Sequence, residues 1–181
     1  MGEKQQGLKE VVLYTDGACV GNPGPGGYGA VLLYGEKRRE IAGGFRRTTN
    51  NRMEIMAVIA GLEALRYPCA VTVFTDSRYV ANSITRRWAV RWRAASWLRD
   101  SKPVPNADLW DRLLCLCEQH TVTFEWVKGH AGTEENERCD RLSVGAARAS
   151  GLPVDTGYEN APRPAGLYDT DPDLDEFSES G

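Results

Sequence analysis

Two apolar runs in this sequence end in the same way, on a threonine and an aspartate followed by a turn. The first is Val11-Val12-Leu13-Tyr14-Thr15-Asp16-Gly17, and the second is Val71-Thr72-Val73-Phe74-Thr75-Asp76-Ser77. Each run has the length and composition of a strand. A helix is predicted between them, so the two strands are expected to lie parallel and adjacent. Asp16 and Asp76 would then meet at one edge of a sheet, where paired carboxylates favour a bound cation.

A glycine-rich stretch follows the first of these strands, with six glycines in residues 17–29. A phosphate loop of the dinucleotide type would open a helix. Residues 28–34 are strand-like instead, which excludes that interpretation. The stretch is predicted to connect a hairpin, and its bare amides would let a sugar-phosphate chain approach closely. A third strand through Phe45 completes an antiparallel meander.

The segment Arg52–Arg66 is predicted to be a largely buried helix, because apolar residues cover much of its surface. Asn50 or Asn51 is its expected N-cap. Glu54 lies in the first turn, where a solvated glutamate is common. This glutamate has apolar neighbours on both sides, which favours a functional role.

The segment 86–102 is both basic and aromatic. It contains Arg86, Arg87, Arg91, Arg93, Arg99 and Lys102, a single acid, Asp100, and three tryptophans, Trp88, Trp92 and Trp97. The tryptophans could anchor this excursion to the core while the arginines are solvated. The segment could also grip nucleic acid, with its cations facing phosphates. Both interpretations can hold, and the number of arginines favours the second.

A fifth strand is predicted at Val122–Val127, and a flexible loop containing His130 follows it. This histidine lies between two glycines rather than on an apolar face, which suits a mobile proton shuttle. The last helix begins at Glu134 and carries Asp140. Taken alone, Asp140 would be interpreted as pairing with an arginine of its own helix.

Length and charge indicate one domain with appendages. The chain has 181 residues, and its last 31 carry eight acids and one arginine. We therefore expect a flexible N-terminus at 1–9, one domain at 10–150 and an acidic, disordered tail at 151–181. No apolar run reaches membrane-spanning length, no signal segment opens the chain, and the five cysteines suit reduced thiols. A cytoplasmic monomer is expected.

The sequence resembles the bacterial-type ribonucleases H, type 1. The resemblance rests on seven stretches that occur in the family's order: residues 14–17, 21–29, 48–54, 75–77, 108–110, 126–132 and 135–140. Together they cover roughly residues 8–150. Any one stretch would be weak evidence, whereas seven in register are a strong signal.

The resemblance implies an α/β, RNase H-like fold, in which helices flank a five-stranded mixed sheet of an antiparallel meander plus parallel strands. It also implies endonucleolytic hydrolysis of the RNA strand of RNA–DNA hybrids, leaving 5′-phosphate and 3′-hydroxyl ends. Asp16, Glu54, Asp76 and Asp140 match the family's four metal-binding carboxylates, and His130 matches its mobile histidine. Two Mg²⁺ ions are the expected cofactors, and Mn²⁺ could substitute because it accepts the same ligands.

The same resemblance implies where the hybrid is bound. The expected contacts are Cys19, Asn22, Thr49, Asn50, Asn51, Arg78, Arg87, Trp88 and Trp92. Arg78 stands where the family often has glutamine, so a phosphate contact is expected there rather than an amide contact to a base. The basic segment 86–102 resembles the family's handle.

Two other classes of protein share part of this pattern. A non-catalytic hybrid-binding module would keep the basic segment and lose carboxylates, but all four are present. A DNA nuclease or transposase of the same broad fold would share the acidic cluster. It would have no need for a loop that reads the 2′-hydroxyl.

Overall fold

The computed structural model describes residues 7–129 and 133–161. Its centre is a five-stranded sheet in the order β3-β2-β1-β4-β7. The strands are β1 (Lys9–Cys19), β2 (Gly24–Tyr34), β3 (Lys37–Thr48), β4 (Cys69–Thr75) and β7 (Thr121–Trp126). The first three pair antiparallel, whereas β1, β4 and β7 run parallel. The predicted meander with added parallel strands is therefore confirmed.

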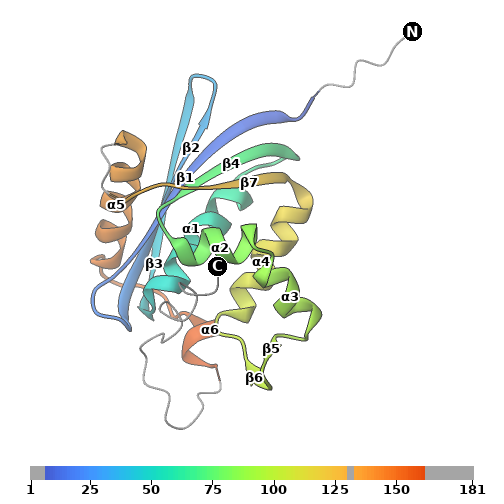
Figure 1. Cartoon of the computed structure of the whole chain (residues 1–181). Coiled ribbons are helices and arrows are strands. Elements are labelled where there is room, and N and C mark those ends of the chain that lie inside the picture. The colour runs from blue at the N-terminus through green and yellow to red at the C-terminus, as the bar shows by residue number, and fades with distance from the viewer. Residues whose placement is uncertain (1–6, 130–132, 162–181) are drawn as a thin grey trace.

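Helices cover both faces of the sheet. Figure 1 shows α5 (Glu134–Ala147) on one side, and α1 (Asn50–Glu63) and α4 (Ala107–Gln119) on the other. The core lies mainly between α1, α4 and the sheet, where Leu13, Ile59, Val73 and Leu113 are fully buried. Among the described residues, no helix is long and apolar enough to cross a membrane.

The helix α1 differs slightly from its prediction. It is largely buried as expected, but it ends at Glu63 rather than Arg66. Its N-cap is Thr49, whose side chain accepts a hydrogen bond from the main-chain N–H of Arg52 at 3.3 Å, and not Asn50 or Asn51. Because Thr and Asn are both good caps, composition alone could not choose between adjacent positions.

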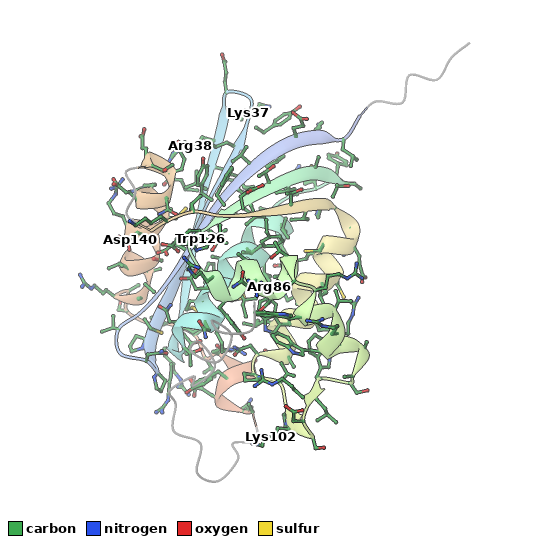
Figure 2. All side chains as sticks on the ribbon, in the orientation of Figure 1. Lys37, Arg38, Arg86, Lys102, Trp126 and Asp140 are labelled. Atoms are coloured by element: carbon green, nitrogen blue, oxygen red, sulfur yellow. The ribbon has the colours of Figure 1, made fainter. Side chains whose placement is uncertain are left out.

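The basic segment forms a small excursion beside the core. It follows α2 (Arg78–Thr85) and consists of α3 (Trp88–Ala94) and then the two short strands β5 (Leu98–Arg99) and β6 (Lys102–Pro103). Trp92 packs on Trp110 of α4 with 6.1 Å between ring centroids, and Trp97 also packs against the core. The anchoring interpretation is thus confirmed for these two tryptophans. Figure 2 places Arg86 and Lys102 on this excursion, and both are exposed.

The ends of the chain differ from their predictions where the structure describes them. Lys9 already belongs to β1, so the expected flexible N-terminus cannot extend to residue 9. Residues 151–161 are not a disordered tail: they include the short helix α6 (Thr156–Glu159), and Asp155 is buried. Residues 1–6 and 162–181 lie outside the described part.

Candidate active site

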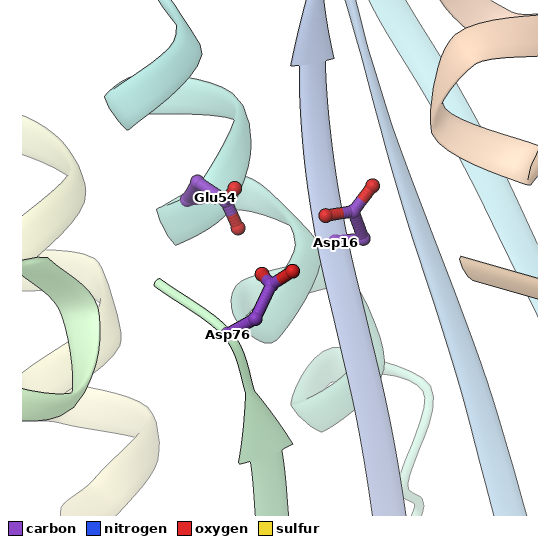
Figure 3. A group of neighbouring side chains, drawn as sticks. All are labelled: Asp16, Glu54 and Asp76. Atoms are coloured by element: carbon purple, nitrogen blue, oxygen red, sulfur yellow. The ribbon is translucent and has the colours of Figure 1, made fainter. Parts of the chain in front are cut away.

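Three of the predicted carboxylates meet at the edge of the sheet. Asp16 lies on β1, Glu54 is the fifth residue of α1 rather than a residue of its first turn, and Asp76 comes directly after β4. One oxygen of each lies within 4.8 Å of the others. Figure 3 shows the three carboxylates turned toward a common space. Asp16 and Glu54 are only 8% and 6% exposed, so most of this charge is withdrawn from solvent.

The backbone explains why these side chains converge. Thr15 and Thr75 are register partners in the parallel pair β1–β4, so the residues that follow them, Asp16 within β1 and Asp76 just past the end of β4, start from neighbouring positions. The helix α1 approaches β1 closely at Gly17. A Cβ atom on Gly17 would lie 2.4 Å from the main-chain nitrogen of Glu54. The glycine therefore lets Glu54 come close to Asp16.

The cluster is electrostatically unfavourable without a cation. The pKa of Asp16 is raised to about 6, first by burial and also by the charges of Asp76 and Asp140, while a hydrogen bond from Ser143 opposes the rise. Burial also raises the pKa of Glu54 well above its ordinary value, with contributions from Asp16 and Asp76. Glu54 Oε2 is buried without a hydrogen-bond partner. Such a carboxylate oxygen, beside other hard oxygen donors, fits a divalent cation.

Asp140 lies near the cluster but outside the set of mutually close oxygens. Its charge acts on Asp16. Arg138 bonds Glu40 instead, through Nε–Oε1 at 2.9 Å and Nη2–Oε2 at 2.7 Å. Within the described residues, no ion pair joins Asp140 to an arginine of its own helix, so the alternative interpretation is not supported. Figure 2 shows Asp140 on α5.

A tryptophan and an arginine flank Asp76. Trp126 donates its indole N–H to the main-chain oxygen of Asp76 at 2.9 Å. The guanidinium of Arg78 lies over the Trp126 ring, 4.2 Å from its centroid. A Cβ on Gly129 would lie 2.7 Å from Asp76 Oδ2, so the loop after β7 passes close to the cluster. His130, the next residue, lies outside the described part of the chain.

The other predicted contacts fall into two groups. Asn22 Oδ1 accepts from the main-chain N–H of Asn50 at 3.1 Å, which ties the glycine-rich turn to the start of α1, where Thr49 and Asn51 also lie. Cys19 begins the same turn, and its Sγ contacts the main-chain oxygens of Gly24 and of Thr48 at the end of β3. Arg87, Trp88 and Trp92 belong instead to the basic excursion.

Some residues at the site were not predicted as part of it. Ser143 donates to Asp16 Oδ2 at 2.7 Å, and it lies three residues after Asp140 on the same helix face. That spacing was a usable signal. Trp126 belongs to the matching stretch 126–132, but no role at the site was predicted for it. The bond between Arg52 and Asp155 could not be predicted from local sequence, because these residues are 103 positions apart.

With this geometry established, known proteins provide a comparison. The model of the RNase H family matches residues 8–148. A ribonuclease H of Rippkaea orientalis is 60% identical over 153 residues, which cover 84% of this chain and 94% of that protein.

Two solved structures are also similar. LC9-RNase H1, described as a type 1 RNase H with the type 2 active-site motif, superposes with a TM-score of 0.70 at 35% identity, covering 84% of this chain and 80% of its own. LC11-RNase H1, solved in complex with RNA/DNA hybrid, gives a TM-score of 0.59 at 23% identity, covering 76% and 96%. The second likeness concerns the fold alone. The family match over most of the chain shows that this protein belongs to the RNase H family.

Proposed function

We propose that the protein is a metal-dependent endoribonuclease that hydrolyses the RNA strand of RNA–DNA hybrids and leaves 5′-phosphate and 3′-hydroxyl ends. The observation that carries this proposal is the convergence of Asp16, Glu54 and Asp76 around a common space, with one buried oxygen of Glu54 unpartnered. Membership of the RNase H family, shown by the family match over residues 8–148 and by relatives named ribonuclease H, supports the choice of substrate.

The residues present fit divalent cations. Asp16, Glu54, Asp76 and Asp140 would hold two ions, and their hard oxygens suit Mg²⁺ and also accept Mn²⁺. When bound, such ions supply an activated water and neutralise the charge that develops on the phosphate. Asp16 would contact both ions, since it belongs to the cluster with Glu54 and Asp76 and its charge also interacts with that of Asp140. Ser143 orients its carboxylate.

The chain's own groups also select and place the substrate in this proposal. Glu54 and the main chain of the glycine-rich turn are the groups for a 2′-hydroxyl, which separates RNA from DNA. Asn22, Thr49, Asn50 and Asn51 meet at the same turn and would contact the minor groove and a DNA phosphate.

The basic excursion would bind the hybrid at a point away from the carboxylate cluster. Its exposed cations Arg86, Arg87, Arg91 and Lys102 suit the phosphate backbone. His130 would assist product release or proton movement, so His130→Ala should slow the reaction without stopping it. A monomeric state and a cytoplasmic location stay predictions.

The test is incubation of end-labelled RNA–DNA hybrid, duplex DNA and single-stranded RNA with the protein and Mg²⁺. We expect cleavage of the RNA strand of the hybrid only, with 5′ ends that are phosphatase-sensitive. Glu54→Gln is the matched control, since it keeps the side-chain shape and should abolish cleavage. Cleavage of duplex DNA would favour a DNA nuclease, and hybrid binding by the native protein without cleavage would favour a binding module.

A further inference from the structure

The guanidinium of Arg52 is buried at the start of α1 between two carboxylates. Its side chain is 3% exposed. It bonds Asp155 through Nε–Oδ2 at 2.8 Å and Nη2–Oδ1 at 2.9 Å. It bonds Asp108 through Nη1–Oδ1 at 2.8 Å and Nη2–Oδ2 at 2.7 Å. Two bidentate contacts fix this planar group in direction as well as in position.

Asp155 fastens the C-terminal segment 151–161 to the body of the protein. It is 5% exposed and accepts a hydrogen bond from Thr48 Oγ1 at 2.7 Å. It also caps α6 by accepting from the main-chain N–H of Tyr158 at 3.2 Å. The main-chain N–H of Arg46 donates to the oxygen of Pro153 at 2.8 Å. This segment lies beyond residues 8–148, which the family model matches.

Arg52 also joins two regions that are proposed to contact the hybrid. One is the hybrid-binding turn, formed by Asn22, Thr49, Asn50 and Asn51, and the other is the basic excursion. The main-chain N–H of Arg52 donates to the side chain of Thr49, the N-cap of α1, at 3.3 Å. Asn50, the next residue after Thr49, is bonded to Asn22 of the glycine-rich turn. On its other side, Asp108 belongs to the first turn of α4.

From α4 the connection continues to the excursion. Asn106 and Trp110 both donate to the hydroxyl of Tyr79 on α2, at 3.2 and 3.1 Å. Trp110 packs on Trp92 of α3. A chain of direct contacts therefore runs from Asp155 to both regions assigned to the hybrid.

We propose that Asp155 is a positioning residue, which acts through Arg52 to fix the hybrid-binding turn relative to the basic excursion. The inference rests on the proposed function. A nucleic-acid duplex is stiff, so two contact regions can bind it together only if their separation is already set. Looser regions would have to be ordered on binding, at a cost in affinity. The carboxylate cluster is a separate group, so chemistry on bound substrate should be spared.

A purely structural role is the competing explanation, because a buried ion pair that loses one partner destabilises a fold. The two explanations differ in what they predict for folded protein. A structural role lowers the unfolding temperature and leaves hybrid affinity unchanged at temperatures well below unfolding. A positioning role weakens hybrid binding in protein that is fully folded.

The test uses full-length Asp155→Asn, which keeps the cap of α6 and removes the charge opposite Arg52. Glu159→Gln is the matched control, because it removes an exposed pair with Arg46 from the same segment. Binding of a fluorescein-labelled hybrid is measured by anisotropy without divalent ions, at low salt and well below each protein's unfolding transition. Steady-state cleavage is measured with Mg²⁺.

For Asp155→Asn we expect Kd and KM to rise roughly fivefold or more, with kcat within about twofold of the native value. Glu159→Gln should behave as native. Asp108→Asn, whose carboxylate is 46% exposed, should shift Kd in the same direction and serves if Asp155→Asn does not fold. Native Kd in both Asp155→Asn and Asp108→Asn would overturn the inference. Failure of the native protein to bind hybrid would instead overturn the proposed function.

Discussion

The hydroxyl oxygen of Ser143 lies 2.7 Å from Oδ2 of Asp16, a hydrogen bond between residues 127 positions apart. It brings α5 to the carboxylate cluster on the far side from Glu54. The same oxygen lies 2.9 Å from the main-chain oxygen of Asp140. Ser143 therefore joins the two predicted ligands that come from β1 and α5, and its donation favours the charged form of Asp16.

Replacing Ser143 by alanine should weaken metal binding most at low pH. Without its donor, the pKa of Asp16 should rise from its present value of about 6, so protons compete better with Mg²⁺. A hydrogen bond to a charged group contributes about 1.5–3 kcal/mol, so the Mg²⁺ concentration for half-maximal cleavage should rise about tenfold or more near pH 6.5. The difference should shrink toward pH 8.5.

Ser83→Ala is the control for that experiment. Ser83 is also fully buried, but its hydroxyl has no hydrogen-bond partner among the described residues. Its removal should leave the Mg²⁺ dependence unchanged. Equal Mg²⁺ dependence in Ser143→Ala and the native protein at every pH would show that the hydrogen bond does not support metal binding.

Asp16→Asn should abolish cleavage, preserve hybrid binding and stabilise the metal-free protein at neutral pH. The pKa of Asp16 is raised in the folded state to about 6 from its ordinary value of 3.8. Between these values the folded protein holds a proton that the unfolded chain releases, so stability falls as pH rises through this window. The pKa rises by about 2.2, and each unit corresponds to 1.36 kcal/mol, so removing this charge should add about 3 kcal/mol to the unfolding free energy at pH 7.5.

Urea unfolding in EDTA measures this effect across pH 4 to 8. The two proteins should converge near pH 4, where the folded native carboxyl is protonated as well. Added Mg²⁺ should stabilise the native protein more than the variant, because only the native site binds the ion strongly. A variant that is less stable than native at pH 7.5 would contradict the assigned pKa shift.

The sequence predicted the sheet and the central site because both depend on local patterns. Two strands that end on Thr-Asp, with a helix between them, required Asp16 and Asp76 to meet, and the register Thr15–Thr75 confirms this. Glu54 was singled out by its apolar neighbours, and it is buried beside them. In each case the evidence lay within a few residues of the side chain concerned.

Long-range pairings could not be predicted in this way. The acidic, proline-containing composition of residues 151–181 predicted disorder, because composition averages over the whole stretch. Asp155 is nevertheless buried against Arg52, 103 residues earlier in the chain. Nothing near either residue indicates its partner. His130, predicted from its flexible loop, lies outside the described residues and stays a prediction.

Gly17→Ala should disrupt the site through sterics rather than charge. The new Cβ would lie 2.4 Å from the main-chain nitrogen of Glu54 and 2.5 Å from the carbonyl carbon of Met53. Because backbone atoms cannot swing aside, α1 must move away from β1, and overpacking of this kind costs about 1–3 kcal/mol. We expect a lower unfolding free energy and a large loss of kcat.

Gly145→Ala provides the matched comparison. Gly145 lies in α5, and a Cβ there would meet no atom within 4 Å. Alanine should stabilise that helix by about 0.5–1 kcal/mol and leave kcat unchanged. Native activity in Gly17→Ala would show that the approach of α1 to β1 is not needed for catalysis.

Residues 162–181 should weaken hybrid binding at low salt through their charge. They carry six acids and one arginine, while residues 1–150 carry an excess of four basic charges. Tethered acids compete with phosphates for the exposed cations of the basic excursion, and salt screens both interactions. Deleting only 162–181, which keeps Asp155 in place, should tighten hybrid binding about two- to fivefold at 50 mM salt and have little effect at 300 mM.

Changing Asp169, Asp171, Asp173 and Asp175 to asparagine keeps the length of this segment and removes most of its charge. If charge is the cause, this full-length variant should reproduce the deletion in anisotropy titrations with labelled hybrid. Affinity unchanged by both variants at low salt would exclude self-screening. Tighter binding in the deletion alone would assign the effect to the bulk of the segment, since steric exclusion of the duplex does not depend on charge and persists at 300 mM salt.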